Sequence, residues 1–97
     1  MVYKIFWTDE AIRNLEDILE YLALKWTNRE VKNFKMKLSK QIEIIGKNLE
    51  IFPVSIFQPR LRKAVLSKQT SIFYEVTDDV IYLVYIFVTY RNPDSLK

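Results

Sequence analysis

Basic side chains gather at two places in the sequence where a charged group could grip a phosphate or a carboxylate. The first is the segment around residues 60–68, and the second follows a long apolar run near the end of the chain. Arginine offers a planar fork of donors that matches these anions, and tyrosines can stack or hydrogen-bond beside it. Basic residues at strand ends are also ordinary surface residues, so both interpretations stay open. The target-binding candidates are Arg60, Arg62, Lys63, Lys68 and Arg91, with Tyr74, Tyr85 and Tyr90 as neighbours.

Other kinds of site are excluded by composition. The chain has no histidine and no cysteine, which rules out Ser-His-Asp and Cys-His pairs and zinc sites of the usual ligand types. A single glycine cannot build a glycine-rich phosphate loop. The acidic residues Glu16, Asp17 and Glu20 lie opposite an apolar helix face and are predicted to be solvated. We therefore expect no cofactor, no metal and no small-molecule substrate.

Length and composition predict one domain over residues 1–97, of which 49% are hydrophobic, a globular profile. The longest apolar run is far shorter than the roughly 18 residues of a membrane span, and the amino-terminal stretch does not resemble a signal peptide. The absence of cysteine fits a reducing compartment. We expect a cytoplasmic protein with no membrane contact, and its formal charge of +3 mildly favours acidic partners.

The first half of the sequence predicts a strand followed by two helices. Val2–Trp7 is apolar and rich in β-branched and aromatic residues, and Thr8 can cap a helix over residues 9–25. Thr27 and Glu30 have the spacing of a capping box that begins a second helix. Apolar residues recur every three or four positions in both segments, so each helix has one buried face. The short connection between them predicts an antiparallel helical hairpin.

The second half predicts a loop and three strands. Pro53 and Pro59 confine their segment to loop or extended structure. Strands are expected over Arg62–Leu66, Thr70–Val76 and Val80–Val88, with "SKQ" and "TDD" as the turns between them. The order strand, two helices, three strands predicts an α+β fold in which the hairpin packs on a mainly antiparallel four-stranded sheet.

The last predicted strand is apolar on both faces. Strict alternation places Ile81, Leu83, Tyr85 and Phe87 on one face and Val80, Tyr82, Val84, Ile86 and Val88 on the other. A helical hairpin can cover only one face of a sheet, so the other must be shielded by a partner or by the proline-containing loop. The sequence leaves these two alternatives open.

Five stretches of sequence, in their order and spacing, carry a family resemblance: "WTDEA" at 7–11, "ILEYL" at 18–22, "FP" at 52–53, "IFYEVTDDVIYLVYIF" at 72–87 and "YRNPDSL" at 90–96. Across nearly its whole length the chain resembles the RelE/ParE superfamily of toxins from type II toxin-antitoxin modules. The resemblance implies a growth inhibitor held inactive by a cognate antitoxin, whose carboxy-terminal segment wraps the toxin.

Within this superfamily, RelE-like members cleave mRNA in the ribosomal A site with lysine, arginine and tyrosine side chains, whereas ParE-like members poison DNA gyrase. Arg91 matches the arginine after the last strand, and Arg62 with Lys63 lies near the basic pair of the second strand. Ser71 replaces the third-strand arginine, and Tyr90 is an imperfect substitute for a terminal tyrosine. Cleavage must activate a ribose 2′-hydroxyl and neutralise phosphorane-like charge, which an incomplete set does poorly.

The resemblance therefore favours a ParE-like protein that poisons DNA gyrase without being an enzyme. The alternative is a RelE-like endoribonuclease that acts on the ribosome and mRNA, and the third possibility is an inactive relic or small binding module. If the protein is an enzyme, its catalytic candidates are Arg62, Lys63, Tyr90 and Arg91.

Overall fold

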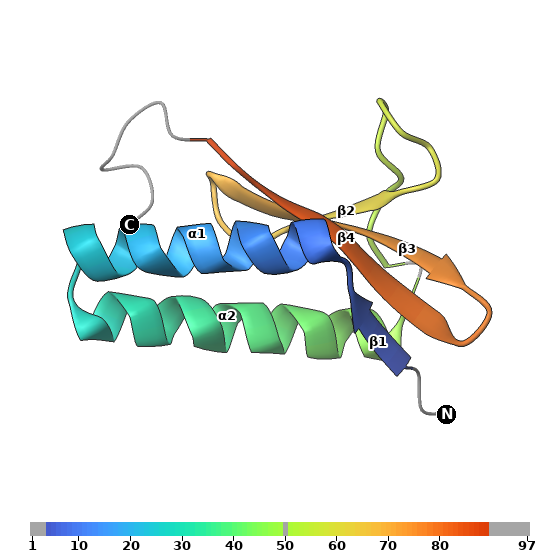
Figure 1. Cartoon of the computed structure of the whole chain (residues 1–97). Helices are drawn as coiled ribbons and strands as arrows, with labels where there is room; N and C mark the ends of the chain where they lie inside the picture. Colours follow the sequence, from blue (N-terminus) through green and yellow to red (C-terminus); the bar gives the residue numbers. More distant parts are fainter. Residues whose placement is uncertain (1–3, 50, 90–97) are drawn as a thin grey trace.

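The computed structural model describes residues 4–49 and 51–89, and its elements follow the predicted order. The two helices lie side by side along one face of the sheet (Figure 1), as the predicted helical hairpin requires. The α+β prediction is confirmed, and α1 and β4 have their predicted bounds. Strand β2 ends one residue earlier than predicted, and β3 ends one residue later. The elements are β1 (Lys4–Trp7), α1 (Asp9–Lys25), α2 (Asn28–Lys47), β2 (Arg62–Val65), β3 (Thr70–Thr77) and β4 (Val80–Val88).

Helix α1 begins where the sequence indicates. The hydroxyl of Thr8 accepts a hydrogen bond from the backbone N–H of Ala11 at 3.1 Å, which satisfies a donor that the first helical turn leaves unpaired. Asp9 and Glu10 lie in that turn, near the positive end of the helix dipole. Ala11, Ile18 and Leu22 are buried, so the apolar stripe faces the sheet.

Helix α2 also begins where expected, but the predicted capping box is not formed. Thr27 is the N-cap, yet its side chain makes no capping hydrogen bond. The backbone N–H of Glu30 instead donates to the backbone oxygen of Thr27 at 3.0 Å. This local turn satisfies the donor without the side chain, so the side-chain part of the prediction is wrong while the helix start is right.

The sheet has the order β1-β4-β3-β2. Strands β2, β3 and β4 are antiparallel neighbours, whereas β1 pairs with β4 in parallel, which confirms a mainly antiparallel sheet. The predicted turn between β3 and β4 contains Asp78 with φ 55°, a left-handed conformation that aspartate tolerates better than most residues.

A β-bulge at Val84 corrects the predicted alternation along β4. Tyr74 pairs with Leu83 while its neighbour Phe73 pairs with Tyr85, so Val84 is an extra residue on β4. Beyond this point every side chain changes face. Ile86 is therefore buried against α1, whereas Tyr85 lies on the opposite face of the sheet. The assignment by strict alternation was correct only as far as the bulge.

Two polar side chains at the start of α1, those of the N-cap Thr8 and of Asn14, satisfy the backbone around the bulge. The Thr8 hydroxyl donates to the backbone oxygen of Val84 at 2.6 Å, and the side-chain oxygen of Asn14 accepts from the N–H of Ile86 at 2.9 Å. Backbone groups that an irregular ladder leaves unpaired are costly when buried. Helix α1 therefore fixes both the position of β4 and the face on which Tyr85 lies.

The hydrophobic core fills the space between the two helices and the sheet face that they cover. The central cluster of buried residues is Ala11, Leu38, Ile45, Ala64, Ile72, Tyr74, Ile81 and Leu83.

Among the described residues, neither helix combines the length and the apolar character that crossing a bilayer requires.

Candidate functional site

The sheet face turned away from the helices carries an apolar surface, which we call the open face. The rings of Phe6 and Tyr82 meet edge to face with centroids 5.6 Å apart, and those of Phe73 and Tyr85 stack at 4.6 Å. Phe6 is 54% exposed and Phe87 is 55% exposed. Exposed aromatic side chains grouped on one sheet face are typical of protein-protein interaction surfaces. The open face consists of the exposed Phe6 and Phe87, the partly buried Tyr82, Val84 and Tyr85, and the buried Phe73 beneath Tyr85.

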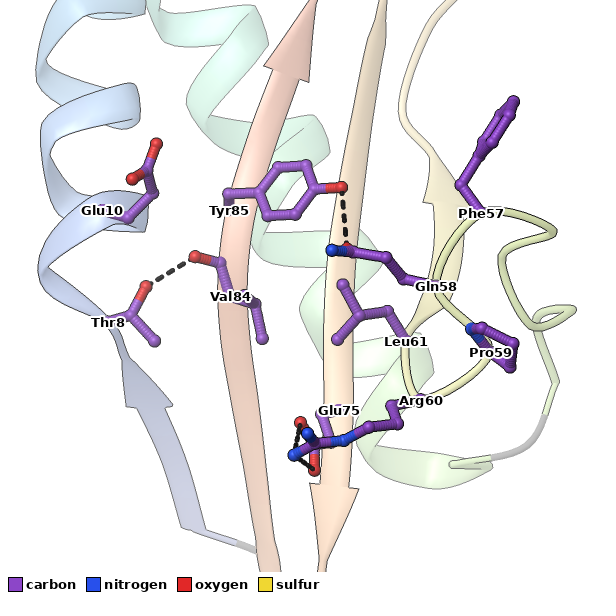
Figure 2. Close-up of a pocket in the computed structure, with 10 residues that line it drawn as sticks. All are labelled: Thr8, Glu10, Phe57, Gln58, Pro59, Arg60, Leu61, Glu75, Val84 and Tyr85. Atoms are coloured by element: carbon purple, nitrogen blue, oxygen red, sulfur yellow. Dashed lines mark hydrogen bonds and ion pairs between the residues drawn. The ribbon is translucent and has the colours of Figure 1, made fainter.

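A cavity of about 660 Å³ lies beside the open face, between the start of α1 and the proline loop, residues 51–61. Figure 2 shows Tyr85 and Gln58 pointing toward one another across it, with Thr8 and Glu10 on the far side. The proline loop therefore covers part of the sheet and leaves Phe6 and Phe87 exposed. Shielding of the rest of this face by a partner stays a prediction. The cavity is lined by Thr8, Glu10, Phe57, Gln58, Pro59, Arg60, Leu61, Glu75, Val84 and Tyr85.

Polar contacts at the cavity hold the loop against the sheet. The guanidinium of Arg60 lies 3.2 Å from a carboxylate oxygen of Glu75, as Figure 2 shows. The Tyr85 hydroxyl donates to the side-chain oxygen of Gln58 at 3.4 Å. The Arg60 side chain is 83% exposed, so its ion pair contributes little stability and can exchange for another carboxylate.

The structure separates two basic candidates that are neighbours in sequence. Arg62 pairs with Tyr74 across the sheet, and its guanidinium donates to the backbone oxygen of Phe52 at 2.7 Å. Lys63 pairs with Phe73 and is exposed on the side of the open face. Arg62 therefore holds the proline loop in place, while Lys63 borders the open face.

The remaining candidates occupy other parts of the chain. Lys68 is exposed in the turn between β2 and β3, and Arg60 lies in the proline loop. Tyr90 and Arg91 lie outside the described residues, so their roles stay predictions. Among residues 4–49 and 51–89, no group of histidine, cysteine, aspartate or glutamate side chains is arranged to hold a metal.

Tyr74 is a buried tyrosine whose chemistry the structure defines. Its hydroxyl donates to the backbone oxygen of Leu49 at 3.0 Å. Burial raises its pKa above the ordinary value of 10.0, while the nearby positive charge of Arg62 acts in the lowering direction. At neutral pH the group is therefore a hydrogen-bond donor that ties the end of α2 to β3, and it is not a general base.

Replacing Tyr74 with phenylalanine is expected to lower the free energy of unfolding by about 1 to 2 kcal/mol, because the Leu49 carbonyl loses its partner. Urea denaturation measures this change, with Tyr82→Phe on the open face as the control. The folded protein holds the Tyr74 proton more tightly than the unfolded chain. Its contribution is thus complete below pH about 10 and is lost as the pH rises further. A Tyr74→Phe variant with unchanged stability would contradict this assignment.

Sequence reasoning missed most of the residues that line the cavity. Thr8 was predicted as a helix cap, but its bond to Val84 depends on a strand 76 positions later in the sequence. One sequence feature could have indicated that the proline loop belongs to a site. It is the pair Ile56 and Phe57, two large apolar residues between prolines. A solvated loop rarely needs such a pair.

Solved structures with the same fold include toxin-antitoxin proteins. The chain shares its fold with a structure of the chromosomal ParDE TA system from P. aeruginosa, at a TM-score of 0.76 and 14% identity, covering 91% of this chain and 97% of that one. It also matches a structure of the E. coli DinJ-YafQ toxin-antitoxin complex, at a TM-score of 0.62 and 10% identity, covering 91% and 93% of the two chains. A search of curated proteins found no match.

The fold is that of a small α+β protein with an exposed apolar sheet face. The family model described as "ParE toxin of type II toxin-antitoxin system, parDE" matches residues 5–93. The chain therefore belongs to the ParE toxin family and is the toxin component of a type II toxin-antitoxin system. The RelE/ParE resemblance seen in the sequence is confirmed, on its ParE side.

Proposed function

We propose that the protein inhibits growth in the cytoplasm by binding DNA gyrase, and that a cognate antitoxin neutralises it by covering the open face. The observation that carries this proposal is the chemistry of that face. Its exposed groups are aromatic and aliphatic, and apolar aromatic surfaces suit a protein partner better than a nucleic-acid backbone. Membership of the ParE family supports the same target class.

The positions of the basic side chains argue against the ribonuclease alternative. An RNase would need cations free to neutralise charge at a scissile phosphate. Arg62 is bonded to the carbonyl of Phe52, whereas the exposed Arg60 and Lys68 lie apart, in the proline loop and in the turn between β2 and β3. Ser71 occupies the third-strand position where RelE-like nucleases carry arginine. In the described part of the chain, these residues do not form a cationic catalytic cluster.

The antitoxin segment that fits this surface is amphipathic and acidic. The open face and the adjoining cavity supply apolar surface, while the exposed Lys63 and Arg60 lie at their border. A flexible tail can order itself in such a concavity, placing apolar side chains on the aromatic rings and carboxylates toward the basic groups. We expect tight binding with moderate dependence on salt.

Assays with purified components test the target class. The protein is expected to block DNA supercoiling by gyrase, and its antitoxin should relieve this inhibition. The protein should leave mRNA intact on programmed ribosomes. The same three reactions run with antitoxin alone are the control. A-site cleavage of mRNA that collapses in an Arg91→Ala variant would establish the ribonuclease alternative and overturn the gyrase proposal.

A further inference from the structure

The tip of the proline loop exposes two large apolar side chains next to each other. Ile56 and Phe57 are each 86% exposed, more than any other large hydrophobic residue among those described. The loop projects beyond the sheet on the side away from the helices (Figure 1), and Phe57 points outward from the cavity (Figure 2). Apolar side chains held in water in this way mark a contact surface.

The loop that carries this pair is internally braced. The buried hydroxyl of Ser55 accepts from the N–H of Phe57 at 3.2 Å and from that of Gln58 at 3.4 Å. The N–H of Ser55 donates to the Leu61 oxygen at 2.7 Å, and the Leu61 N–H donates to the Gln58 oxygen at 2.8 Å. Because these bonds fix the backbone of the tip before binding, little conformational freedom remains to be lost when a partner engages it.

The base of the loop is attached to the sheet as well. The N–H of Lys63 donates to the Pro53 oxygen at 3.0 Å, and Val54 forms an isolated bridge with Arg62. Proline at positions 53 and 59 restricts the backbone further. The two exposed side chains therefore stand on a rigid support rather than on a free loop.

The shape and charge of the tip define the partner that fits it. A flexible antitoxin tail gains most from the concave cavity, whereas a convex, braced tip needs a concavity that already exists on a folded protein. Residues 51–61 contain no acid, and Arg60 is exposed at the base of the tip. We propose that Ile56 and Phe57 insert into an apolar, acid-rimmed pocket of the folded target protein, separately from the antitoxin tail. This inference rests on the proposed function only in taking the protein to act by binding a protein target.

The test removes the apolar tip and leaves the brace intact. An Ile56→Gln/Phe57→Gln double variant is expected to fold normally, because neither side chain is packed in the core. It should keep its antitoxin affinity within about threefold, because Ile56 does not line the cavity and the Phe57 ring points away from it (Figure 2). Its inhibition of gyrase and of growth should fall at least about tenfold, as for an anchor at the centre of an interface. The matched control is Leu24→Gln, which changes a 76% exposed apolar residue on α1 and should alter neither activity.

A second variant tests the brace itself. Ser55→Ala keeps both apolar side chains but removes the acceptor for the N–H groups of Phe57 and Gln58. A loosened tip should bind its target about threefold more weakly while the antitoxin affinity is unchanged, because only target binding requires the tip to be rigid. An unchanged effect on the target would contradict the role of the brace.

The outcomes separate this inference from the gyrase proposal. If the parent protein inhibits gyrase and the double variant does so equally well, the anchor is wrong and gyrase stays the target. If the parent protein leaves gyrase active but the double variant loses growth inhibition with its antitoxin binding intact, the anchor is supported and the gyrase proposal fails. Equal loss of antitoxin binding and growth inhibition would overturn the assignment of the tip to the target.

Discussion

A Phe87→Glu variant is expected to bind the cognate antitoxin at least about 100-fold more weakly than the parent protein. Phe87 is 55% exposed on the open face, so its replacement removes an aromatic anchor from the proposed interface and places a negative charge opposite an acidic tail. A 100-fold change corresponds to about 2.7 kcal/mol. Calorimetric titration with the antitoxin measures it directly.

Two further variants separate charge from position. Phe87→Lys also removes the ring but supplies an attractive charge, so it should weaken binding much less than Phe87→Glu does. Leu24→Glu introduces the same acid at a 76% exposed apolar residue of α1 and should leave antitoxin binding unchanged. If all three variants bind like the parent protein, the antitoxin does not occupy the open face.

Replacing Thr8 with valine is expected to lower the free energy of unfolding by about 2 to 3 kcal/mol. Valine has nearly the same shape but cannot cap α1 through the N–H of Ala11, and it leaves the carbonyl of Val84 without its 2.6 Å donor. The loss of a cap costs about 1 kcal/mol, and leaving the part-buried Val84 carbonyl unpaired adds about 1 to 2 kcal/mol. Chemical denaturation followed by circular dichroism measures the sum.

The control for this change is Thr77→Val at the end of β3. Thr77 is exposed, and its hydroxyl bonds only to the Glu75 carboxylate at 3.4 Å among the contacts described. Its replacement should alter stability by no more than about 0.5 kcal/mol. Equal effects at the two positions would show that the contact between α1 and the bulge is unimportant for stability.

The elements were predictable because their signals are local. Helical periodicity with Thr8 before it located α1, and the aspartates at 78 and 79 located the turn into β4. The order of the elements also predicted the α+β class, since two amphipathic helices must cover one sheet face. These features depend on residues close together in sequence, where propensity and spacing carry the information.

The arrangement of the site was not predictable because it depends on pairing between distant residues. The bulge at Val84 has no proline or glycine to mark it, and it is stabilised by Thr8 and Asn14 of another element. Arg62 holds the proline loop by donating to the carbonyl of Phe52, which only the folded loop brings within reach. Spacing along one strand therefore could not reveal which side chains share the open face.

The parallel pairing of β1 with β4 determines when the four-stranded sheet can form during synthesis of the chain. Lys4–Trp7 must wait for residues 80–83, which are made much later, before it has a strand partner. Contacts between such distant segments form late because a long stretch of chain has to be closed. A growing or truncated chain that ends before β4 lacks both the contact of Phe6 with Tyr82 and the hydrogen bond from Thr8 to Val84. The open face is thus assembled only after β4 has been made.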